Sequence, residues 1–312
     1  MQPHRSAVLP LAFWVFWLAA ALPLAAQASA VPGTPAAAFS GQAAYRYTAA
    51  VVAFGPRPPG TAAHRRTEQY ILAQLRQDGA RIVQDRFSAH TPRGPFHEDN
   101  IIAKFGPRKG QILLVTGHYD TKFESFRFVG ANDGGSSTGL LLEAGAVLAK
   151  HPLPAPVWLV FLDGEEAVKT WTATDSTYGS RQLASQLQHD GLVPRIHALI
   201  LVDMIGDKDL DVLRETNSTA WLNSFVAAAA RRLGYSRYFF QQQGAIEDDH
   251  IPFLKVGIPS VDLIDFTYGP NNSATPGPYW HTAKDTMGKL SAHSLQVVGS
   301  VVMETLQMLA AQ

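Results

Sequence analysis

GHYDTK (Gly117–Lys122), GANDGGSSTG (Gly130–Gly139) and FLDGEEA (Phe161–Ala167) follow one another at short intervals in the middle of the chain. The first and third motifs each come directly after a continuous apolar run, and the second opens a segment whose leucines have helical spacing. Continuous apolar strands that alternate with helices indicate a mainly parallel sheet covered on both faces. Because ligand sites in such sheets lie beyond the carboxyl ends of the strands, the polar residues of these motifs are the first candidates for a functional site.

The same alternation continues on both sides of the three motifs. Strands are expected at residues 81–87, 100–105, 111–116, 157–162, 197–204 and 260–264, and helices at residues 42–54, 61–77, 136–150, 178–189, 220–233 and 291–310. The sequence therefore predicts one α/β domain over residues 42–312. Its expected architecture is a three-layer sandwich in which a mixed, mainly parallel central sheet is flanked by helices.

The N-terminal segment has a different composition. Arg5 gives it a positive start, Leu9–Ala26 is apolar, and Ala28–Ala30 supplies the small residues that a signal peptidase reads. We therefore expect residues 1–30 to be a secretory signal peptide, residues 31–41 to be a flexible lead-in, and the mature protein to be secreted or periplasmic. A retained membrane anchor is the alternative, because the apolar stretch approaches the length of a membrane span.

Composition excludes several roles. Lys plus Arg equals Asp plus Glu, at 26 each, so no net charge draws the protein to nucleic acid or to a membrane surface. Hydrophobic residues make up 46% of the chain, which is enough for a sizeable core. Because the chain contains no cysteine, disulfides and lipoprotein attachment are excluded, and a metal site must use oxygen and nitrogen ligands. We expect a monomer without stable membrane association after signal cleavage.

Two adjacent carboxylates, Glu165 and Glu166, follow a buried strand. They repel each other unless a cation or a proton separates their roles, so the pair is typical of a metal ligand beside a general base. Asp133 in the glycine-rich loop and Asp203 at the end of an apolar strand are further candidates, since an unpaired charge there would be costly. The plainer interpretations are acidic residues in a helix first turn and a helix cap.

Histidines supply the other candidates. His118 ends the GHYDTK strand, and it could be a metal ligand or a core histidine that Asp120 orients through a hydrogen bond. His281 follows Trp280 in a loop rich in Pro, Gly and Asn, where a lone histidine is more often structural than a ligand.

A resemblance to a known family gives these candidate residues specific roles. The succession GHYDTK, GANDGG, DGEEA, YGSRQLA, VDMIGD, DDHIPFLKVGIP and WHT resembles the zinc-dependent exopeptidase superfamily of secreted aminopeptidases, over roughly residues 45–310. More narrowly, it is similar to the glutaminyl-peptide cyclotransferase (glutaminyl cyclase) family. Three features favour the cyclases: Trp171 shortly after the paired glutamates, Asp248 where aminopeptidases usually carry a small residue, and Trp280 directly before a histidine.

Carried over to this chain, the resemblance implies one zinc ion held by Asp133, Glu166 and His281, with water or substrate as the fourth ligand. Three protein ligands and an open position are what a catalytic zinc needs. The resemblance assigns Glu165 the role of general acid and base.

It also implies roles for the surrounding side chains. Asp203 and Asp248 would join the acid–base residue in a carboxylate network that shares a proton. Trp171 and Trp280 would line the pocket for the N-terminal side chain of the substrate, although tryptophans are otherwise commonly core residues.

The implied activity is an acyltransferase reaction on peptide or protein N-termini, the cyclisation of N-terminal glutamine to pyroglutamate with release of ammonia. A secreted two-zinc aminopeptidase is the alternative, because GANDGGSSTG and LVDMIGD are more similar to the aminopeptidases. In that case His118 and Asp203 would bind a second zinc, with Asp133 bridging the two ions. The number of zinc ions, one or two, stays open. A binding domain without chemistry is disfavoured, since every implied ligand is present.

Overall fold

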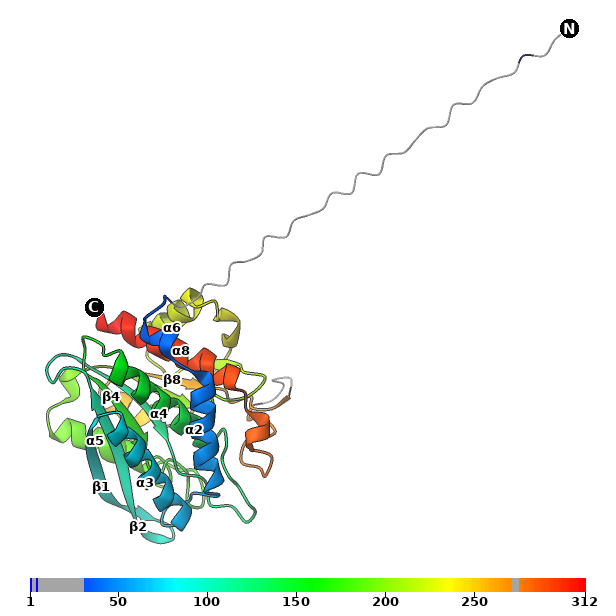
Figure 1. The fold of residues 1–312 in the computed structure, drawn as a ribbon. Helices are drawn as coiled ribbons and strands as arrows, with labels where there is room; N and C mark the ends of the chain where they lie inside the picture. Colours follow the sequence, from blue (N-terminus) through cyan, green and yellow to red (C-terminus); the bar gives the residue numbers. More distant parts are fainter. Residues whose placement is uncertain (2–3, 5–30, 271–274) are drawn as a thin grey trace.

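The computed structural model describes residues 1, 4, 31–270 and 275–312 (Figure 1). The strands are β1 Arg81–Thr91, β2 Gly94–Phe105, β3 Ile112–His118, β4 Val157–Leu162, β5 Ile196–Asp203, β6 Val212–Glu215, β7 Phe239–Gly244 and β8 Ser260–Ile264. The helices are α1 Pro35–Ala38, α2 Gly41–Ala53, α3 Ala62–Gln77, α4 Gly135–Lys150, α5 Tyr178–His189, α6 Ala220–Arg232, α7 His250–Lys255 and α8 Ala292–Ala310. Short 3₁₀ turns lie at Val193–Arg195, Ser236–Tyr238 and Met287–Lys289.

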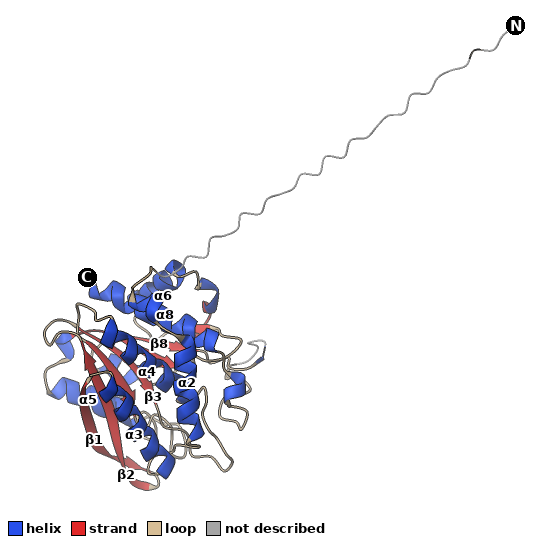
Figure 2. Cartoon of the chain, viewed as in Figure 1, coloured by secondary structure: helices blue, strands red, loops and turns tan. Residues whose placement is uncertain are grey.

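A six-stranded sheet in the order β1-β2-β4-β3-β5-β8 forms the centre of the molecule. The strands β4, β3, β5 and β8 are parallel, whereas β2 pairs antiparallel with both β4 and β1. The predicted mixed, mainly parallel sheet between helical layers is therefore confirmed. Figure 2 shows helices on either side of the strands, with α2, α3 and α4 in front of the sheet.

Alternation along the strands explains the three layers. In β3, Leu113 and Val115 face the larger core cluster with α3, α4 and α8, while Ile112 and Leu114 face the cluster with α5 and α7. Successive side chains of a strand point to opposite faces, so a strand that is apolar at every position requires cover on both sides. The continuous apolar runs of the sequence thus place β3, β4 and β5 in the middle of the fold.

The expected flexible lead-in at residues 31–41 is wrong from residue 35 onward. Ala36 and Phe39 are 1% and 3% exposed, and the carbonyl of Phe39 accepts a hydrogen bond from Gln296 Nε2 at 2.8 Å. The Phe39 ring occupies the gap above Gly299, where a Cβ would lie 2.1 Å from a ring carbon. Alanine and proline here indicated flexibility, but one aromatic anchor packs the segment against α8.

The predicted element boundaries agree with the structure to different extents. β4, α5 and β8 begin and end at the predicted residues, whereas the hairpin of β1 and β2 extends well beyond them. The parallel pair β6–β7 was missed, because β7 is largely polar and exposed. The predicted signal peptide lies almost wholly outside the described residues. Within the described residues, no helix combines the length and apolarity that a bilayer span requires.

Candidate active site

Three parallel strands deliver the polar motifs to one edge of the sheet. β3 ends at His118, β4 ends just before the loop that carries Glu165, and β5 ends at Asp203. Because β3 lies between the other two strands, its terminal imidazole is central. His118 Nε2 is 3.2 Å from Asp203 Oδ1, and His118 Nδ1 is 3.9 Å from Glu165 Oε2. The strand-end prediction therefore identified one contiguous site.

Asp133, Glu166 and His281 come from three separate loops and converge on one point. His281 Nε2 lies 3.3 Å from Asp133 Oδ2 and 3.3 Å from Glu166 Oε1. With zinc–ligand bonds of about 2.0–2.1 Å, the ligand atoms of a tetrahedral ion lie about 3.3 Å apart. Asp133 Oδ2 and both Glu166 carboxyl oxygens are buried and make no hydrogen bond among the residues that the structure describes, and the ammonium of Lys122 lies 3.7 Å from Glu166 Oε2. Because buried carboxylates without donors are costly, this trio fits a divalent cation.

A second trio shares Asp133. His118 Nε2 is 3.2 Å from Asp133 Oδ1 and 3.2 Å from Asp203 Oδ1. One oxygen of Asp133 thus faces each trio, which is the arrangement of a bridging carboxylate. Both groups of ligand atoms are close enough to hold an ion. Geometry alone therefore accommodates one metal or two.

Glu165, Asp203 and Asp248 line one cavity beside these trios. Burial raises the pKa of the Glu165 carboxyl well above its usual range, the positive charge of His118 works against this, and the negative charge of Glu166 adds to it. Burial and the nearby Asp203 charge raise the pKa of Asp248 to about 7. Carboxyl groups that interact this strongly titrate as a set, so they are suited to hold and move a shared proton.

The cavity, of about 270 Å³, has an aromatic wall. Trp171 and Trp280, the two tryptophans that the resemblance singled out, both line it, and Phe266 adds a third ring. Trp280 stacks on the imidazole of His281 at a centroid distance of 3.9 Å, and Phe266 meets Trp280 edge-on at 5.3 Å. Both tryptophans are therefore half-buried pocket residues, and the stack of Trp280 also fixes the orientation of His281.

Two residues at the site have left-handed backbone conformations. His281 has φ 48°, and Met204, which directly follows Asp203, has φ 47°. Such conformations cost roughly 1–3 kcal/mol in residues other than glycine and persist only where surrounding contacts hold them. Here one strained residue, His281, belongs to the first trio, and the other, Met204, follows Asp203 of the second. Both residues line the cavity.

Asp120 connects the first motif to the third. Its carboxylate accepts hydrogen bonds from the backbone N–H of Glu165 at 3.1 Å and of Glu166 at 3.3 Å, and it lies 3.4 Å from His118 Nδ1. The sequence predicted only the contact with the histidine. In addition, this side chain holds the loop with the paired glutamates.

Arg57 is a structural support of the site that the sequence did not reveal. Its guanidinium is fully buried and donates to the carbonyls of Tyr119 at 3.1 Å, Val129 at 2.7 Å and Gly130 at 2.9 Å. Burial lowers the pKa of Arg57 to about 10, a decrease that nearby carboxylates limit. Bonds from a side chain to backbone carbonyls leave no signal in a sequence, so Arg57 could not be identified from the pattern.

Asp285 was missed as well. Its carboxylate accepts hydrogen bonds from the backbone N–H of Asn132 at 2.8 Å and of Asp133 at 3.2 Å, and from the hydroxyl of Tyr268 at 2.7 Å. It therefore connects the glycine-rich loop to the segment that follows His281. It thus connects the segments of two of the three ligands of the first trio, Asp133 and His281.

Beneath the paired glutamates lies a further buried acid, Glu98. The turn before Glu165 is made by Gly164, whose φ is 62°, and a Cβ there would lie 2.3 Å from Glu98 Oε2. Glu98 is 2% exposed, and neither of its carboxyl oxygens has a hydrogen-bond partner within the described part of the chain. Burial, with a contribution from the Asp163 charge, raises the pKa of Glu98 from 4.5 to about 10.

We expect the Glu98→Gln variant to be more stable than the wild type, by a margin that grows with pH. The folded protein keeps the Glu98 proton up to about pH 10, whereas the unfolded chain loses it near 4.5. Between these values the unfolded state binds fewer protons, so this group lowers stability as pH rises. In denaturant unfolding, the increase in the free energy of unfolding that Glu98→Gln gives over the wild type should be about 1–3 kcal/mol larger at pH 8 than at pH 6. Glu124→Gln, at a less buried carboxylate, is the control, and a pH-independent effect at Glu98 would contradict the assignment.

Comparisons with known proteins agree with this geometry. The model for peptidase family M28 matches residues 100–306. The glutaminyl-peptide cyclotransferase of Drosophila melanogaster is 32% identical over 260 residues, which cover 74% of this chain and 70% of that protein. Among solved structures, an Acidobacteriales bacterium glutaminyl cyclase is 43% identical with a TM-score of 0.85, over 92% of this chain and 99% of that chain. The Porphyromonas gingivalis glutaminyl cyclase is 34% identical with a TM-score of 0.79, over 86% of this chain and 98% of that chain. These findings confirm the resemblance: the chain belongs to peptidase family M28, among its glutaminyl cyclases.

Proposed function

We propose that this protein is a zinc-dependent glutaminyl-peptide cyclotransferase, which converts the N-terminal glutamine of peptides and proteins to pyroglutamate with release of ammonia. The observation that carries the proposal is the position of Glu165 beside the Asp133–Glu166–His281 trio, inside a small cavity with an aromatic wall. The names of the relatives support the same activity.

Asp133, Glu166 and His281 would hold one zinc ion. Zinc bound there supplies a Lewis acid that polarises the γ-amide carbonyl of the substrate. The buried oxygens of the two carboxylates support this assignment, because they make no hydrogen bond within the described chain and a bound cation would satisfy them.

Glu165 would carry the proton. The α-amine nitrogen of the substrate attacks the side-chain amide carbon, the new C–N bond closes the ring, and the bond to the amide nitrogen breaks. Glu165 accepts a proton from the attacking amine and delivers it to the departing nitrogen, which leaves as ammonia. Asp203 and Asp248 would share a second proton and orient the polar groups of the substrate within the same cavity.

The aromatic wall would favour cyclisation over hydrolysis. The reaction is intramolecular, so much of the barrier is lowered when the glutamine side chain is held folded back on its own amine. Trp171, Phe266 and Trp280 narrow the cavity around that side chain. They also exclude water, which at the same carbonyl carbon would yield glutamate instead of the ring.

An aminopeptidase is the second candidate, favoured by the His118–Asp133–Asp203 trio and its 3.2 Å separations. In that enzyme Glu165 would activate a water molecule against the first peptide bond. We propose one zinc per chain, which corresponds to the cyclase.

A pair of substrates separates the two activities. We expect a glutaminyl-peptide to release ammonia and to lose the mass of ammonia, while a leucyl-peptide of the same downstream sequence stays intact under equal conditions. The rates should differ by at least about 10³-fold, because only glutamine carries the internal electrophile. Mass spectrometry and an ammonia assay give the readout. Free leucine released at a comparable rate would support the peptidase and contradict the cyclase.

We further propose that the protein acts outside the cytoplasm. The apolar stretch Leu9–Ala26 with the small residues after it supports export, and the cysteine-free composition suits a compartment of either redox state.

A further inference from the structure

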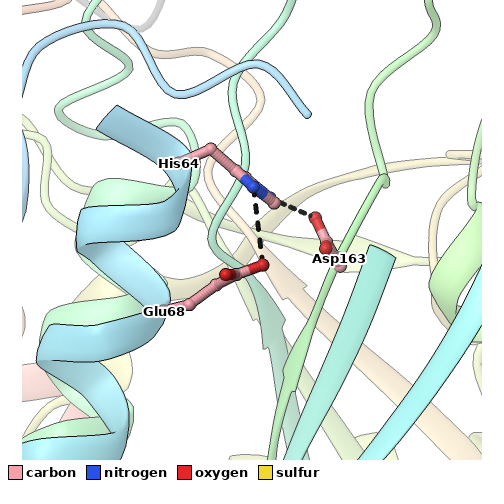
Figure 3. Close-up of side chains that lie close together, drawn as sticks. All are labelled: His64, Glu68 and Asp163. Atoms are coloured by element: carbon pink, nitrogen blue, oxygen red, sulfur yellow. Dashed lines mark hydrogen bonds and ion pairs between the residues drawn. The ribbon is translucent and has the colours of Figure 1, made fainter. Parts of the chain in front are cut away.

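A buried cluster on α3 lies outside the catalytic cavity. His64 Nε2 is 2.7 Å from Asp163 Oδ1, and His64 Nδ1 is 3.5 Å from Glu68 Oε1 (Figure 3). His64 and Asp163 are 1% and 0% exposed. The helix that carries His64 contributes no residue to the metal trios or to the cavity, so the active site itself does not account for the cluster.

The separations argue against a metal ion here. Two ligand atoms of one zinc ion lie about 3.3 Å apart, as they do in both trios of the active site. The 2.7 Å between His64 and Asp163 is instead the length of a charge-assisted hydrogen bond. If Asp163 is a hydrogen-bond acceptor rather than a ligand, only His64 and Glu68 are left, which is too few for a protein metal site.

Asp163 is the first residue after β4 and lies two positions before Glu165. Its second carboxyl oxygen accepts a hydrogen bond from the backbone N–H of Asp99 at 2.8 Å, and its own N–H donates to Asn100 Oδ1 at 3.1 Å. The carboxylate is therefore fixed between β2 on one side and α3 on the other. His64 forms the 2.7 Å side-chain hydrogen bond of this arrangement.

The same imidazole touches the other catalytic loop. Its ring stacks on Tyr119 at a centroid distance of 5.2 Å and an interplanar angle of 21°. Tyr119 lies between His118 and Asp120, and its hydroxyl donates to the carbonyl of Asp99 at 3.0 Å. His64 thus contacts both loops that meet at the acid–base residue.

We propose that His64 is a positioning residue for the reaction: through its hydrogen bond to Asp163 and its stack on Tyr119, it fixes the loop of Glu165 relative to the loop of His118. The inference rests on the proposed function only in taking Glu165 as the proton carrier. Replacing His64 would lower kcat whether the enzyme catalyses cyclisation or peptide hydrolysis. A failure of the His64 proposal is therefore distinct from a failure of the proposed function.

Electrostatics support a persistent link. Burial alone would lower the pKa of His64, but the charges of Asp163 and Glu68 outweigh it, so the pKa is raised. This shift favours the form of the imidazole that donates from Nε2 to Asp163. Replacing it with an apolar side chain would leave a fully buried carboxylate oxygen without that donor, and the loop would have to move to regain one.

The test compares His64→Leu with His64→Gln at saturating zinc. Leucine fills the space but donates nothing, and we expect kcat to fall about 10–100-fold, as for other residues that orient a catalytic group. KM should change less than about threefold, since the cavity wall is untouched. Glutamine places an amide N–H near the position of His64 Nε2. The kcat of His64→Gln should therefore be at least about tenfold above that of His64→Leu, or close to the wild-type value if His64→Leu loses less than that.

Leu75→Ala is the matched control for destabilisation. Leu75 lies on the same helix about three turns after His64, is 0% exposed and packs in the main core. It should lower the melting temperature at least as much as His64→Leu while leaving kcat per folded, zinc-loaded molecule unchanged. A purely structural role for His64 predicts that same outcome for His64→Leu, and that result would overturn the proposal.

A double variant tests the route through Asp163. If His64 acts by holding Asp163, the kcat loss of His64→Leu combined with Asp163→Asn should be close to that of the more damaging single variant, rather than to the product of the two. Multiplying losses would show that the two residues act independently, which contradicts the positioning role. Zinc content above one ion that is lost only in the His64 variants would instead identify a metal site at this cluster.

Discussion

Glu165→Gln is expected to lower kcat by about a thousandfold or more, at the upper part of the range for losing a general acid–base group. The amide has the shape of the carboxyl group but neither accepts nor returns a proton at neutral pH. The backbone N–H of this residue still donates to Asp120, so the loop should keep its conformation. Substrate binding should change little, and the loss should therefore fall on kcat rather than on KM.

The zinc content of this variant is the essential control. Glu165 is not one of the three proposed ligands, so Glu165→Gln should bind as much zinc as the wild type. The matched Glu166→Gln variant, one residue along, should lose both zinc and activity. Two neighbouring isosteric changes then separate the proton carrier from the ligand. If Glu165→Gln retains wild-type turnover, the proton comes from another group and the proposed mechanism fails.

The strand-end part of the site could be predicted from the sequence. His118, Glu165 and Asp203 follow continuous apolar runs, and parallel strands deliver such residues to one sheet edge whatever the loops do. His281 could not be placed this way, because it lies in a loop without periodicity. Its assignment came from the resemblance, and the structure brings its Nε2 within 3.3 Å of two carboxylates.

The residues that hold the site in place could not be predicted from the sequence, for a different reason. Arg57, His64 and Asp285 act through hydrogen bonds that depend on which loops become neighbours. Arg57 and Asp285 bind backbone carbonyls and N–H groups, which every residue possesses, so no partner can be identified from the pattern. His64 lies on the buried side of α3, where the spacing of apolar residues does not reveal what a histidine will contact. Such residues become visible only when tertiary contacts are known.

Removing zinc is expected to abolish turnover, and one equivalent should restore it. The apoprotein would keep Asp133, Glu166 and Asp203 buried close together without a cation, which raises their mutual repulsion. Its melting temperature should therefore fall on chelation and recover on zinc addition. When the apoprotein is titrated, activity should rise linearly and reach its plateau at one zinc per chain.

Two histidine variants then distinguish the trios. His281→Ala removes a ligand of the first trio and should raise the zinc dissociation constant by at least about 100-fold, since ligand loss costs more than the loss of an outer partner. His118→Asn should leave the stoichiometry at one, because the second trio is predicted to be unused. The hydrogen bonds of Asp120 to the two glutamate N–H groups do not require the imidazole, so the first trio should survive. A plateau at two equivalents in the wild type that drops to one in His118→Asn would show that Asp133 bridges two ions, and the protein would then be a two-metal enzyme.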